Sequence, residues 1–425
     1  MVPALLPIRR ASHRSHLAQP ARASYRAPMI SLTEARGIIA QNIAPLAPIR
    51  LPLAEARGRI LRETVTAPGD FPAFDRAAMD GYAVGLDDHS ERFRVVMEVQ
   101  AGSPPARAIA PGECARIFTG ARIPGGASQV IMQEDTRREG EWMIPQRRDQ
   151  TTHIRRRGDD AAAGAVLLES GARLHASELA LLAQVGATQP LVSPAARVLH
   201  VCTGRELVPP ETEPRDSEIR DTNSTMVAAM LTSRCAQIEH QSRCGDDLAE
   251  TVARIRSVKN ETWNLLLISG GASVGDYDFG AKALRELGFA IHFDRLNLRP
   301  GKPLIFATRG DQAAFVLPGN PVSHLVTFHL AVRLALECLQ AAPPSWPLAD
   351  VLMLEDLPAQ SDSRETYWPC EVRSESGSLH ARPLGWKNSG DLCGLAGANA
   401  LLQILPASGP IASGASAKCL LLDLA

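Results

Sequence analysis

The chain has 425 residues, which is long enough for several domains rather than one compact core. Its 45 Lys and Arg residues nearly balance 46 Asp and Glu residues, giving a net charge of -1. This balance offers no electrostatic argument for nucleic acid or an anionic membrane as a principal partner. We therefore expect neither partner.

The cysteines and the apolar runs indicate a cytoplasmic protein. Eight cysteines are scattered without a CxxC pair or a Cys/His cluster at zinc spacing, which favours free thiols in a reducing compartment. No uninterrupted apolar run reaches the length of a membrane span. The longest candidate, Val322 to Leu339, is broken by His324, His329, Arg333 and Glu337.

The first 28 residues carry five arginines, and the first acidic residue of the chain is Glu34. They resemble a transit peptide, but the helix start at Ser31 favours an upstream start site, so we expect a disordered basic extension over 1–28. Helices are predicted from Ser31 to Gln41 and from Leu51 to Leu61.

The next part of the chain predicts a small β domain. Asp75 and Asp80 bracket an apolar pair before a strand; Asp80 is expected to cap backbone N–H groups, and Asp75 is freer to face a ligand. Short alternating runs from Phe93 to Met143 indicate strands, with Thr119 at the end of one. These features assign 49–149 to a β-rich domain.

A basic turn follows this domain, in which three arginines precede Asp159 and Asp160. Such a run is usually a solvated face, although Asp160 can point inward in a turn. A helix predicted from Leu174 to Val185 would return the chain to the first helix. We therefore expect 29–48 and 150–190 to form one linking domain.

From Arg197 onward, strand-like and helical patterns alternate, which is typical of a mostly parallel, doubly wound α/β sheet. The predicted strands are Arg197 to Cys202, Gln237 to His240, Asn264 to Ile268, Ile291 to Leu296, Leu304 to Ala307 and Ala314 to Leu317. The predicted helices are Thr225 to Thr232, Leu248 to Arg256, Ala281 to Leu287 and Val322 to Leu339. This α/β domain is assigned to 191–340, and a separate β domain, after a Pro-rich linker, to 348–425.

Polar loops follow the predicted strands, at the edge where doubly wound sheets bind ligands. The most informative loop follows the apolar run that ends at Ile268: it contains three glycines, Ser269, Ser273 and Asp278. Glycines let the backbone approach a ligand closely, and successive N–H groups can hold an anion. Read alone, this loop is equally compatible with an ordinary turn.

The neighbouring loops add acids, a lysine and a helix start. They contain Glu206, Asp246, Arg299, Lys302, and Asn320 with Pro321 at the first turn of a helix. Together they predict a site for a phosphate-bearing ligand with a divalent cation.

Six ordered motifs resemble the molybdopterin molybdenumtransferase family (MoeA and gephyrin E-domain-like proteins) over about residues 29 to 425. They are Ala78 to Ala83, Thr119 to Ala121, Arg157 to Asp160, Ser269 to Gly275 with Asp278, Pro300 to Pro303 and Leu317 to Ser323. The resemblance implies a four-domain, elongated homodimer. It also implies Mg²⁺-dependent transfer of molybdate to adenylylated molybdopterin with release of AMP.

The resemblance also implies roles for individual residues. Asp246 and Asp278 would hold Mg²⁺, Lys302 would neutralise charge on the leaving phosphate, and Glu206 would orient water or metal. The cofactor-binding positions would be Ser269, Gly270, Gly271, Ser273, Arg299, Pro318, Gly319, Asn320, Pro321, Ser323 and Ser389. Asp75, Thr119 and Asp160 would line the cleft from the partner subunit, and partners would include other cofactor-synthesis proteins or recipient molybdoenzymes.

Some positions depart from the family pattern. Ala77 replaces a serine, Arg205 stands where an aspartate usually precedes Glu206, and Pro369 occupies the position of an arginine. Arg299 replaces a lysine, and Asn388 replaces a glycine before Ser389. These departures leave open an alternative function, a catalytically impaired paralogue that binds molybdopterin as a carrier or scaffold. A nucleotide pyrophosphatase is a third reading, which leaves the two β domains without a role.

Overall fold

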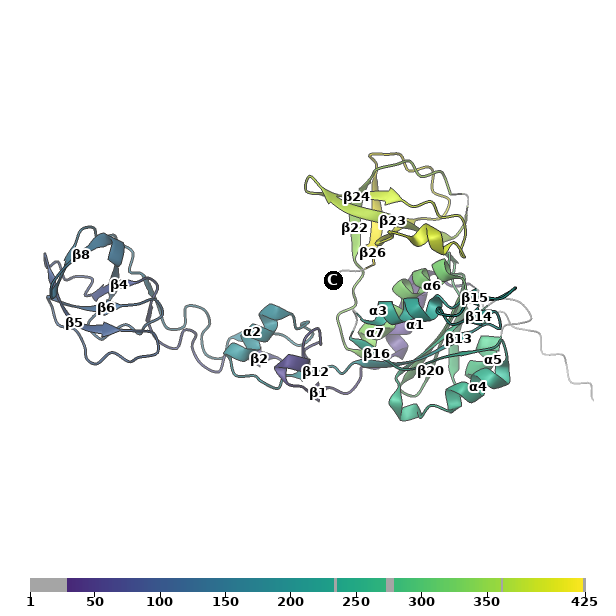
Figure 1. Cartoon of the computed structure of the whole chain (residues 1–425), viewed down its shortest axis with the longest axis horizontal. Coiled ribbons are helices and arrows are strands. Elements are labelled where there is room, and N and C mark those ends of the chain that lie inside the picture. Colours follow the sequence, from purple (N-terminus) through teal and green to yellow (C-terminus); the bar gives the residue numbers. More distant parts are fainter. Residues whose placement is uncertain (1–28, 233–234, 273–278, 361, 423–425) are drawn as a thin grey trace, which may run out of the picture.

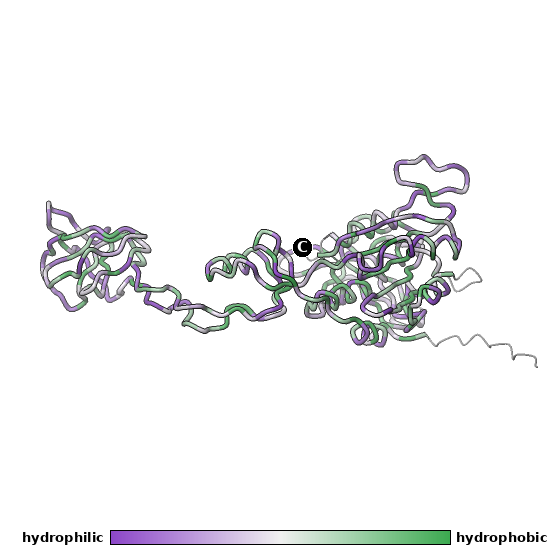
Figure 2. The backbone as a smooth tube through the Cα atoms, turned by 90° about the horizontal axis from the view of Figure 1, so that it is seen from below, coloured by the Kyte–Doolittle hydropathy of each residue, from purple (hydrophilic) through white to green (hydrophobic). Residues whose placement is uncertain are grey.

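The computed structural model describes residues 29–232, 235–272, 279–360 and 362–422. The basic extension 1–28, Ser273 and Asp278 lie outside these residues. The chain is elongated, with a small β domain at one end and an α/β domain beside a C-terminal β domain at the other (Figure 1). The view from below in Figure 2 shows the same outline.

The small β domain is built on one six-stranded sheet with the order β7-β4-β6-β5-β9-β8. Its strands are β4 (Gly81–Val84), β5 (Phe93–Val99), β6 (Glu113–Ile117), β7 (Gln129–Met132), β8 (Thr136–Glu139) and β9 (Trp142–Pro145). The strands expected between Phe93 and Met143 are therefore present. Gly81 is needed where β4 meets β7, because a Cβ there would lie 2.0 Å from the carbonyl oxygen of Ile131.

The central unit joins this domain to the rest of the chain through two-stranded pairings and one helix, α2 (Ala176–Gln184). The pairs are β1 (Ile49–Arg50) with β12 (Leu191–Val192), β2 (Val65–Thr66) with β11 (Val166–Leu168), and β3 (Arg76–Ala77) with β10 (Ile154–Arg155). The helix predicted from Leu51 to Leu61 is wrong, since only the 3₁₀ turn η1 (Leu53–Glu55) forms there. Pro52 precedes that turn, and Gly58 has a φ of +76°, which ends any helical path. The apolar side chains of this stretch still pack, because Ala56 and Leu61 join the core beside α2.

The α/β domain contains a six-stranded sheet with the order β16-β13-β17-β21-β20-β18. Its strands are β13 (Ala196–Thr203), β16 (Ala236–Cys244), β17 (Leu265–Ser269), β18 (Ala290–Arg295), β20 (Pro303–Arg309) and β21 (Gln312–Leu317). The first four in this order are parallel, and β20 runs antiparallel to both of its neighbours, β21 and β18. The predicted doubly wound, mostly parallel sheet is confirmed.

Helices cover both faces of this sheet. The elements are α3 (Asn223–Thr232), α4 (Leu248–Arg256), η3 (Asn260–Thr262), α5 (Phe279–Glu286), α6 (Pro321–Thr327), η4 (Phe328–Val332) and α7 (Arg333–Leu339). One core contains residues of α3 and of the α6–η4–α7 helix, and the other contains residues of α4 and α5. The predicted helices of this domain are confirmed.

The first helix, α1 (Leu32–Asn42), begins at Ser31 with a capping box, in which Ser31 and Glu34 bond reciprocally. Leu32, Ala35 and Ile39 pack into the α/β core against α7 and η4. This packing differs from the expected linking domain, in which α1 and α2 would share a core. The apolar face of α1 is buried against α7 and η4 of the α/β domain.

The helix from Pro321 to Leu339 is long and apolar enough to cross a membrane by length and composition, but 89% of its apolar window is buried inside the protein. It is a core helix of the α/β domain (Figure 1). Its polar residues are accommodated locally, because Arg333 and Glu337 form a buried ion pair of 3.1 Å.

The C-terminal β domain closes on itself, because β23 pairs with both β24 and β25. The strand order is β19-β23-β24-β22-β26-β25. The bounds are β19 (Leu298–Arg299), β22 (Leu348–Met353), β23 (Glu365–Glu375), β24 (Ser378–Pro383), β25 (Ala400–Ile404) and β26 (Ser416–Leu421), with the 3₁₀ turn η5 (Leu392–Leu395). Since β19 belongs to the α/β part of the chain, this pairing fixes the two domains side by side.

Candidate functional site

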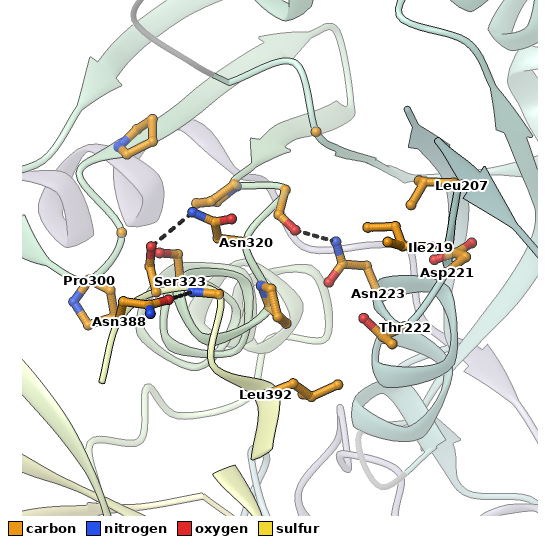
Figure 3. Close-up of a pocket in the computed structure, with 18 of the residues that line it drawn as sticks. Leu207, Ile219, Asp221, Thr222, Asn223, Pro300, Asn320, Ser323, Asn388 and Leu392 are labelled. Atoms are coloured by element: carbon orange, nitrogen blue, oxygen red, sulfur yellow. Dashed lines mark hydrogen bonds between the residues drawn. The ribbon is translucent and has the colours of Figure 1, made fainter. Parts of the chain in front are cut away.

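A cavity of about 1130 Å³ lies between the carboxyl edge of the large sheet and the C-terminal β domain (Figure 3). Twelve of the predicted site residues line it: Glu206, Asp246, Gly270, Gly271, Arg299, Lys302, Pro318, Gly319, Asn320, Pro321, Ser323 and Ser389. The structure thus brings together loops that are up to 183 residues apart in sequence (206 to 389). Their convergence is what the carboxyl edge of a doubly wound sheet provides.

The turn after β17 exposes backbone to this cavity. Gly270 and Gly271 have φ values of +99° and +68°, which favour glycine. A Cβ on Gly270 would lie 2.5 Å from Thr203 Oγ1, and one on Gly271 would lie 2.8 Å from the Phe279 ring. Both glycines are therefore required by conformation and by space.

The C-terminal domain closes the cavity at the start of α6. Asn320 Nδ2 donates to Ser389 Oγ at 2.8 Å, and the Val322 N–H donates to the Ser389 carbonyl at 3.0 Å. The sequence predicts that Asn320 caps its own helix. Its side chain instead forms a hydrogen bond across the domain boundary and makes no cap bond. Ser389 is held at the cavity wall by these two bonds.

The charged side chains of the cavity mostly divide by sign. Glu206, Glu218, Asp221 and Asp246 supply carboxylates from the segment between β13 and α3 and from the loop after β16, and Arg220 is one cation on that same side. The other cationic groups are Arg299, Lys302, Arg364 and Lys387, from the segment after β18 and from the C-terminal domain. A ligand with both phosphate oxygens and hydrogen-bond donors, bound with a divalent cation, matches this division.

A polar segment that sequence reasoning missed forms another wall, from β14 (Leu207–Val208) and β15 (Ile219–Arg220) to the start of α3. Asn223 Nδ2 donates to the Gly319 carbonyl at 2.8 Å (Figure 3). Its Oδ1 is buried without a hydrogen-bond partner among the described residues, as is the Oγ of Ser224. The Asp-Thr-Asn run at 221–223, just before a predicted helix, was the available signal.

Ser269 differs from the prediction, because its side chain is fully buried and does not line the cavity. Its Oγ lies 2.8 Å from His200 Nε2 and 2.8 Å from His324 Nε2. Burial lowers the pKa of His200 to about 4 and that of His324 to about 3, so both imidazoles are neutral at pH 7. The hydroxyl thus holds β13, β17 and α6 together beneath the glycine turn.

Thr119, Asp75 and Asp160 do not line the cavity. Thr119 follows β6, at the far end of the molecule from the α/β domain (Figure 1). Its N–H and its hydroxyl both donate to Asp80 Oδ1 at 2.7 Å, so Asp80 has the expected structural role. Asp75, expected to be freer, instead accepts from the Arg157 N–H and pairs with Arg156 Nη1 at 2.7 Å.

Asp160 borders a separate cavity of about 510 Å³, lined also by Phe71 to Phe74, Arg76, Arg155 and Gln184. It pairs with Arg155 and lies 3.9 Å from Arg76 Nη2. The backbone N–H groups of Asp160 and Ala161 both donate to the Phe71 carbonyl, at 2.8 and 3.1 Å. These two bonds hold the acidic turn against the segment around Phe71. Within one chain, this second cavity and the large one are separate.

The sequence departures lie mostly off the cavity wall. Arg205 is exposed and does not line the cavity; its Cγ is next to Gly245. Pro369 is a strand residue opposite Leu401, and Ala77 is buried in β3. Asn388 does line the cavity, and its Oδ1 accepts from the Gly390 N–H at 2.9 Å.

The described part of the cavity offers carboxylates to a metal ion but no closed protein cage. No group of three or more His, Cys, Asp or Glu side chains that could hold a metal occurs in the described residues. Mg²⁺ characteristically uses one or two carboxylates and takes its remaining oxygens from water and phosphate. Glu206 and Asp246 are two carboxylates on the wall of this cavity.

Three family models match successive parts of the chain. They describe the MoeA N-terminal region (domain I and II) at residues 30–186, a probable molybdopterin binding domain at 200–337, and the MoeA C-terminal region (domain IV) at 353–422. Relatives include a molybdopterin molybdenumtransferase of Nostoc sp., 34% identical over 379 residues and covering 83% of each chain. Another, from Bacillus subtilis, is 33% identical and covers 83% of this chain and 85% of its own.

A solved structure with a similar fold is the molybdopterin biosynthesis MoeA protein of Pyrococcus horikoshii. It has a TM-score of 0.78 and 28% sequence identity, and the match covers 93% of this chain and all of that chain. Fold and cavity together define a multidomain α/β protein with a large polar cavity at the carboxyl edge of its parallel sheet. More narrowly, the chain belongs to the molybdopterin molybdenumtransferase family.

Proposed function

We propose that this protein is a molybdopterin molybdenumtransferase, which takes adenylylated molybdopterin and molybdate and releases AMP and molybdenum cofactor. The observation that carries the proposal is the charge-divided cavity, in which twelve of the residues expected from the resemblance converge. Curated relatives of the same name match over most of the chain.

The phosphate groups of the substrate would lie against the glycine turn and the start of α6. Gly270 and Gly319 lie next to each other on the cavity wall, because a Cβ on Gly319 would lie 3.7 Å from the Gly270 Cα, and neither carries a side chain that would keep a ligand from the backbone. Lys302 would neutralise the charge that develops on the leaving phosphate, acting as a fixed cation on the wall.

Asp246 and Glu206 are the described carboxylates that would hold Mg²⁺, with Asp278 as a further expected ligand. A bound Mg²⁺ would neutralise phosphate charge and align the oxygens of the substrate. Cationic side chains from the opposite wall would bind the oxyanion, and the Ser389 hydroxyl would donate a hydrogen bond to it.

The homodimer is part of the proposal. The cavity in one chain lacks Thr119, Asp75 and Asp160, which lie elsewhere in the elongated molecule. A second copy related by a two-fold axis and packed antiparallel to the first would bring its own cluster to the open side of the cavity. We also infer a cytoplasmic site of action, which suits eight free cysteines.

The carrier alternative is weakened, because Arg205 and Pro369 do not line the cavity, although the departures at Arg299 and Asn388 do. The test is AMP release from adenylylated molybdopterin by the purified chain with Mg²⁺, with molybdate present or omitted. The proposal expects release that depends on molybdate. Tight pterin binding without release would contradict it and support a carrier.

A further inference from the structure

Two arginines from different domains are brought next to each other at the cavity wall. Arg299 ends β19 of the α/β domain, and Arg364 immediately precedes β23 of the C-terminal domain. The two strands pair in parallel, with Leu298 opposite Glu365 and Arg299 opposite Thr366. The backbone register therefore places two guanidinium groups together, and both line the cavity.

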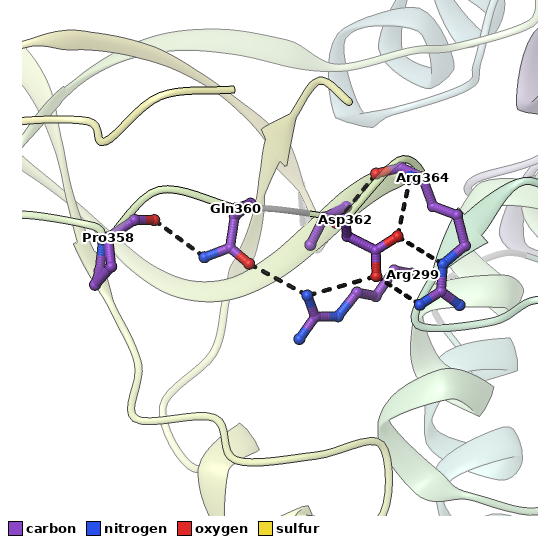
Figure 4. Close-up of polar contacts among 6 residues, drawn as sticks. Arg299, Pro358, Gln360, Asp362 and Arg364 are labelled. Carbon is purple, nitrogen blue, oxygen red and sulfur yellow. Dashed lines mark hydrogen bonds and ion pairs between the residues drawn. The ribbon is translucent and has the colours of Figure 1, made fainter. Parts of the chain in front are cut away.

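A single carboxylate joins these two cations (Figure 4). Asp362 accepts from Arg364 Nε at 2.8 Å and from Nη2 at 2.6 Å, and its Oδ2 lies 3.7 Å from Arg299 Nη1. The Arg364 guanidinium, with a smaller contribution from Arg299, lowers the pKa of Asp362 to about 2. The carboxylate is therefore charged throughout the physiological range.

Asp362 stands behind the arginines rather than in front of them. It does not line the cavity, and only 16% of its side chain is exposed. Gln360 Oε1 supports Arg299 Nη1 from the same side at 3.3 Å, and the Trp386 ring lies 5.5 Å from the Arg299 guanidinium carbon. Arg299 is thus held on several sides.

The contacts leave a defined edge of each guanidinium for a ligand. Asp362 uses Nε and Nη2 of Arg364 and Nη1 of Arg299. The hydrogen bonds and ion pairs of the two arginines within the described residues use neither Arg364 Nη1 nor Arg299 Nη2. Two planar donors held at fixed angles suit a tetrahedral oxyanion better than one freely rotating cation.

We propose that Asp362 is a positioning residue, which orders Arg299 and Arg364 across the domain boundary so that they bind a tetrahedral divalent oxyanion. Without it, two like charges would repel each other, and two long side chains would have to be ordered when the ligand binds. The negative charge of Asp362 also reduces attraction for the anion, but at this partly hydrated wall solvent screens that opposing effect. The ordering effect therefore dominates.

This inference rests on the proposed function for the identity of the oxyanion, which is molybdate or the substrate phosphate. The two are distinguished by measuring affinities separately, with molybdate and with inorganic phosphate, by calorimetry on the full-length chain. The steady-state KM for molybdate and kcat are measured alongside.

The main variant is Asp362→Asn, and the control is Asp350→Asn. Asp350 is in the same β domain and pairs with Lys418 at 2.9 Å, outside the cavity. We expect Asp362→Asn to weaken binding of one of the two anions about 10-fold, which is the cost of ordering one to two side chains. If that anion is molybdate, its KM should rise in parallel while kcat at saturation stays within about 2-fold. Asp362→Glu should restore part of the affinity, and Asp350→Asn should change none of these values.

A milder substitution, Gln360→Ala, tests the proposal if Asp362→Asn does not fold. Gln360→Ala removes one support of Arg299 and should weaken the same anion about 2- to 3-fold. Unchanged or tighter anion binding in Asp362→Asn would overturn the inference, as would a wild-type protein that binds neither anion. If the wild-type protein binds the anion but releases no AMP, the proposed function is refuted and the role of Asp362 is not.

Discussion

The large cavity and the distant Asp75/Thr119/Asp160 group differ in how many of their charged side chains form ion pairs. In the cavity, Glu206, Asp246 and Lys302 form no ion pair with another described residue. In the distant group, Asp75 pairs with Arg156 at 2.7 Å and Asp160 pairs with Arg155. The cavity thus keeps these three charges unpaired, although its Arg299 and Arg364 pair with Asp362. In the distant group, both carboxylates are already neutralised by arginines.

This difference indicates how the work is divided. Side chains left without counter-charges in a cavity are available to phosphate, metal or oxyanion. Paired charges on a turn mainly fix its shape, and exposed pairs add little stability. We therefore expect the cavity to supply the reacting charges and the distant group to shape and close the cleft of a second chain.

Lys302→Ala should have the largest effect. Removing a fixed cation from the cavity should lower molybdate-dependent AMP release by about 100- to 1000-fold. The measurement is single-turnover AMP release under saturating substrate. Lys418→Ala is the matched control, because Lys418 pairs with Asp350 away from the cavity, and it should retain full activity. Equal activity of the two variants would remove Lys302 from the site.

Asp246→Asn should rank next, because it replaces an expected Mg²⁺ ligand by a neutral one. We expect AMP release to fall about 10- to 100-fold and the half-saturating Mg²⁺ concentration to rise, as judged from a metal titration. Asp247→Asn is the adjacent control. Asp247 caps α4 by accepting from the Glu250 N–H at 2.8 Å, and asparagine caps equally well. An unchanged Mg²⁺ dependence in Asp246→Asn would contradict the assignment.

Asp160→Asn should have a smaller effect on activity and almost none on stability. The ion pairs it breaks are exposed, so the free energy of unfolding should change by about 1 kcal/mol or less. We expect kcat/KM to fall about 10-fold, because the turn would lose its shape at the shared cleft. Full activity in this variant, checked by steady-state kinetics, would argue that the distant group stays outside the cleft.

The prediction that bears least on activity concerns how stability depends on pH through the buried histidines below the glycine turn. An unfolded histidine titrates near pH 6.5, whereas burial lowers the pKa of His200 to about 4 and that of His324 to about 3. As pH falls below 6.5, the unfolded state therefore binds protons that the folded state does not, and stability should decline down to about pH 3.

Thermal midpoints between pH 7 and 4 measure this decline. His324→Gln should flatten it after allowance for its own loss of stability, whereas replacement of the exposed His89 by Gln should not. An identical pH profile for His324→Gln and wild type would refute the linkage.

The sequence predicted the α/β domain well because its elements repeat a strong local pattern. Runs such as Leu265 to Ile268 are apolar on both faces, and the glycines that follow need positive φ values. Since the carboxyl ends of parallel strands share one edge, the cavity residues followed from the strand order.

Other features depended on tertiary packing and could not be read from local patterns. The apolar spacing from Leu51 to Leu61 suggests a helix, yet its side chains fill the core beside α2 from an irregular backbone. Ser269 looked like a ligand contact because nothing local reveals that His200 and His324 converge on its hydroxyl. The packing of α1 with α7 likewise joins segments about 300 residues apart, beyond the reach of periodicity.

The most direct test of the shared cleft is a mixing experiment with two defective chains. Lys302→Ala damages the cavity, and Asp160→Asn damages the group that we expect a second chain to contribute. If each cleft combines one cavity with its partner's group, a mixed dimer has one cleft with both changes and one with neither. Refolding or co-expressing equal amounts should then give AMP release of about a quarter of the wild-type value, above that of either variant alone. AMP release no higher than the average of the two separate variants would contradict the account.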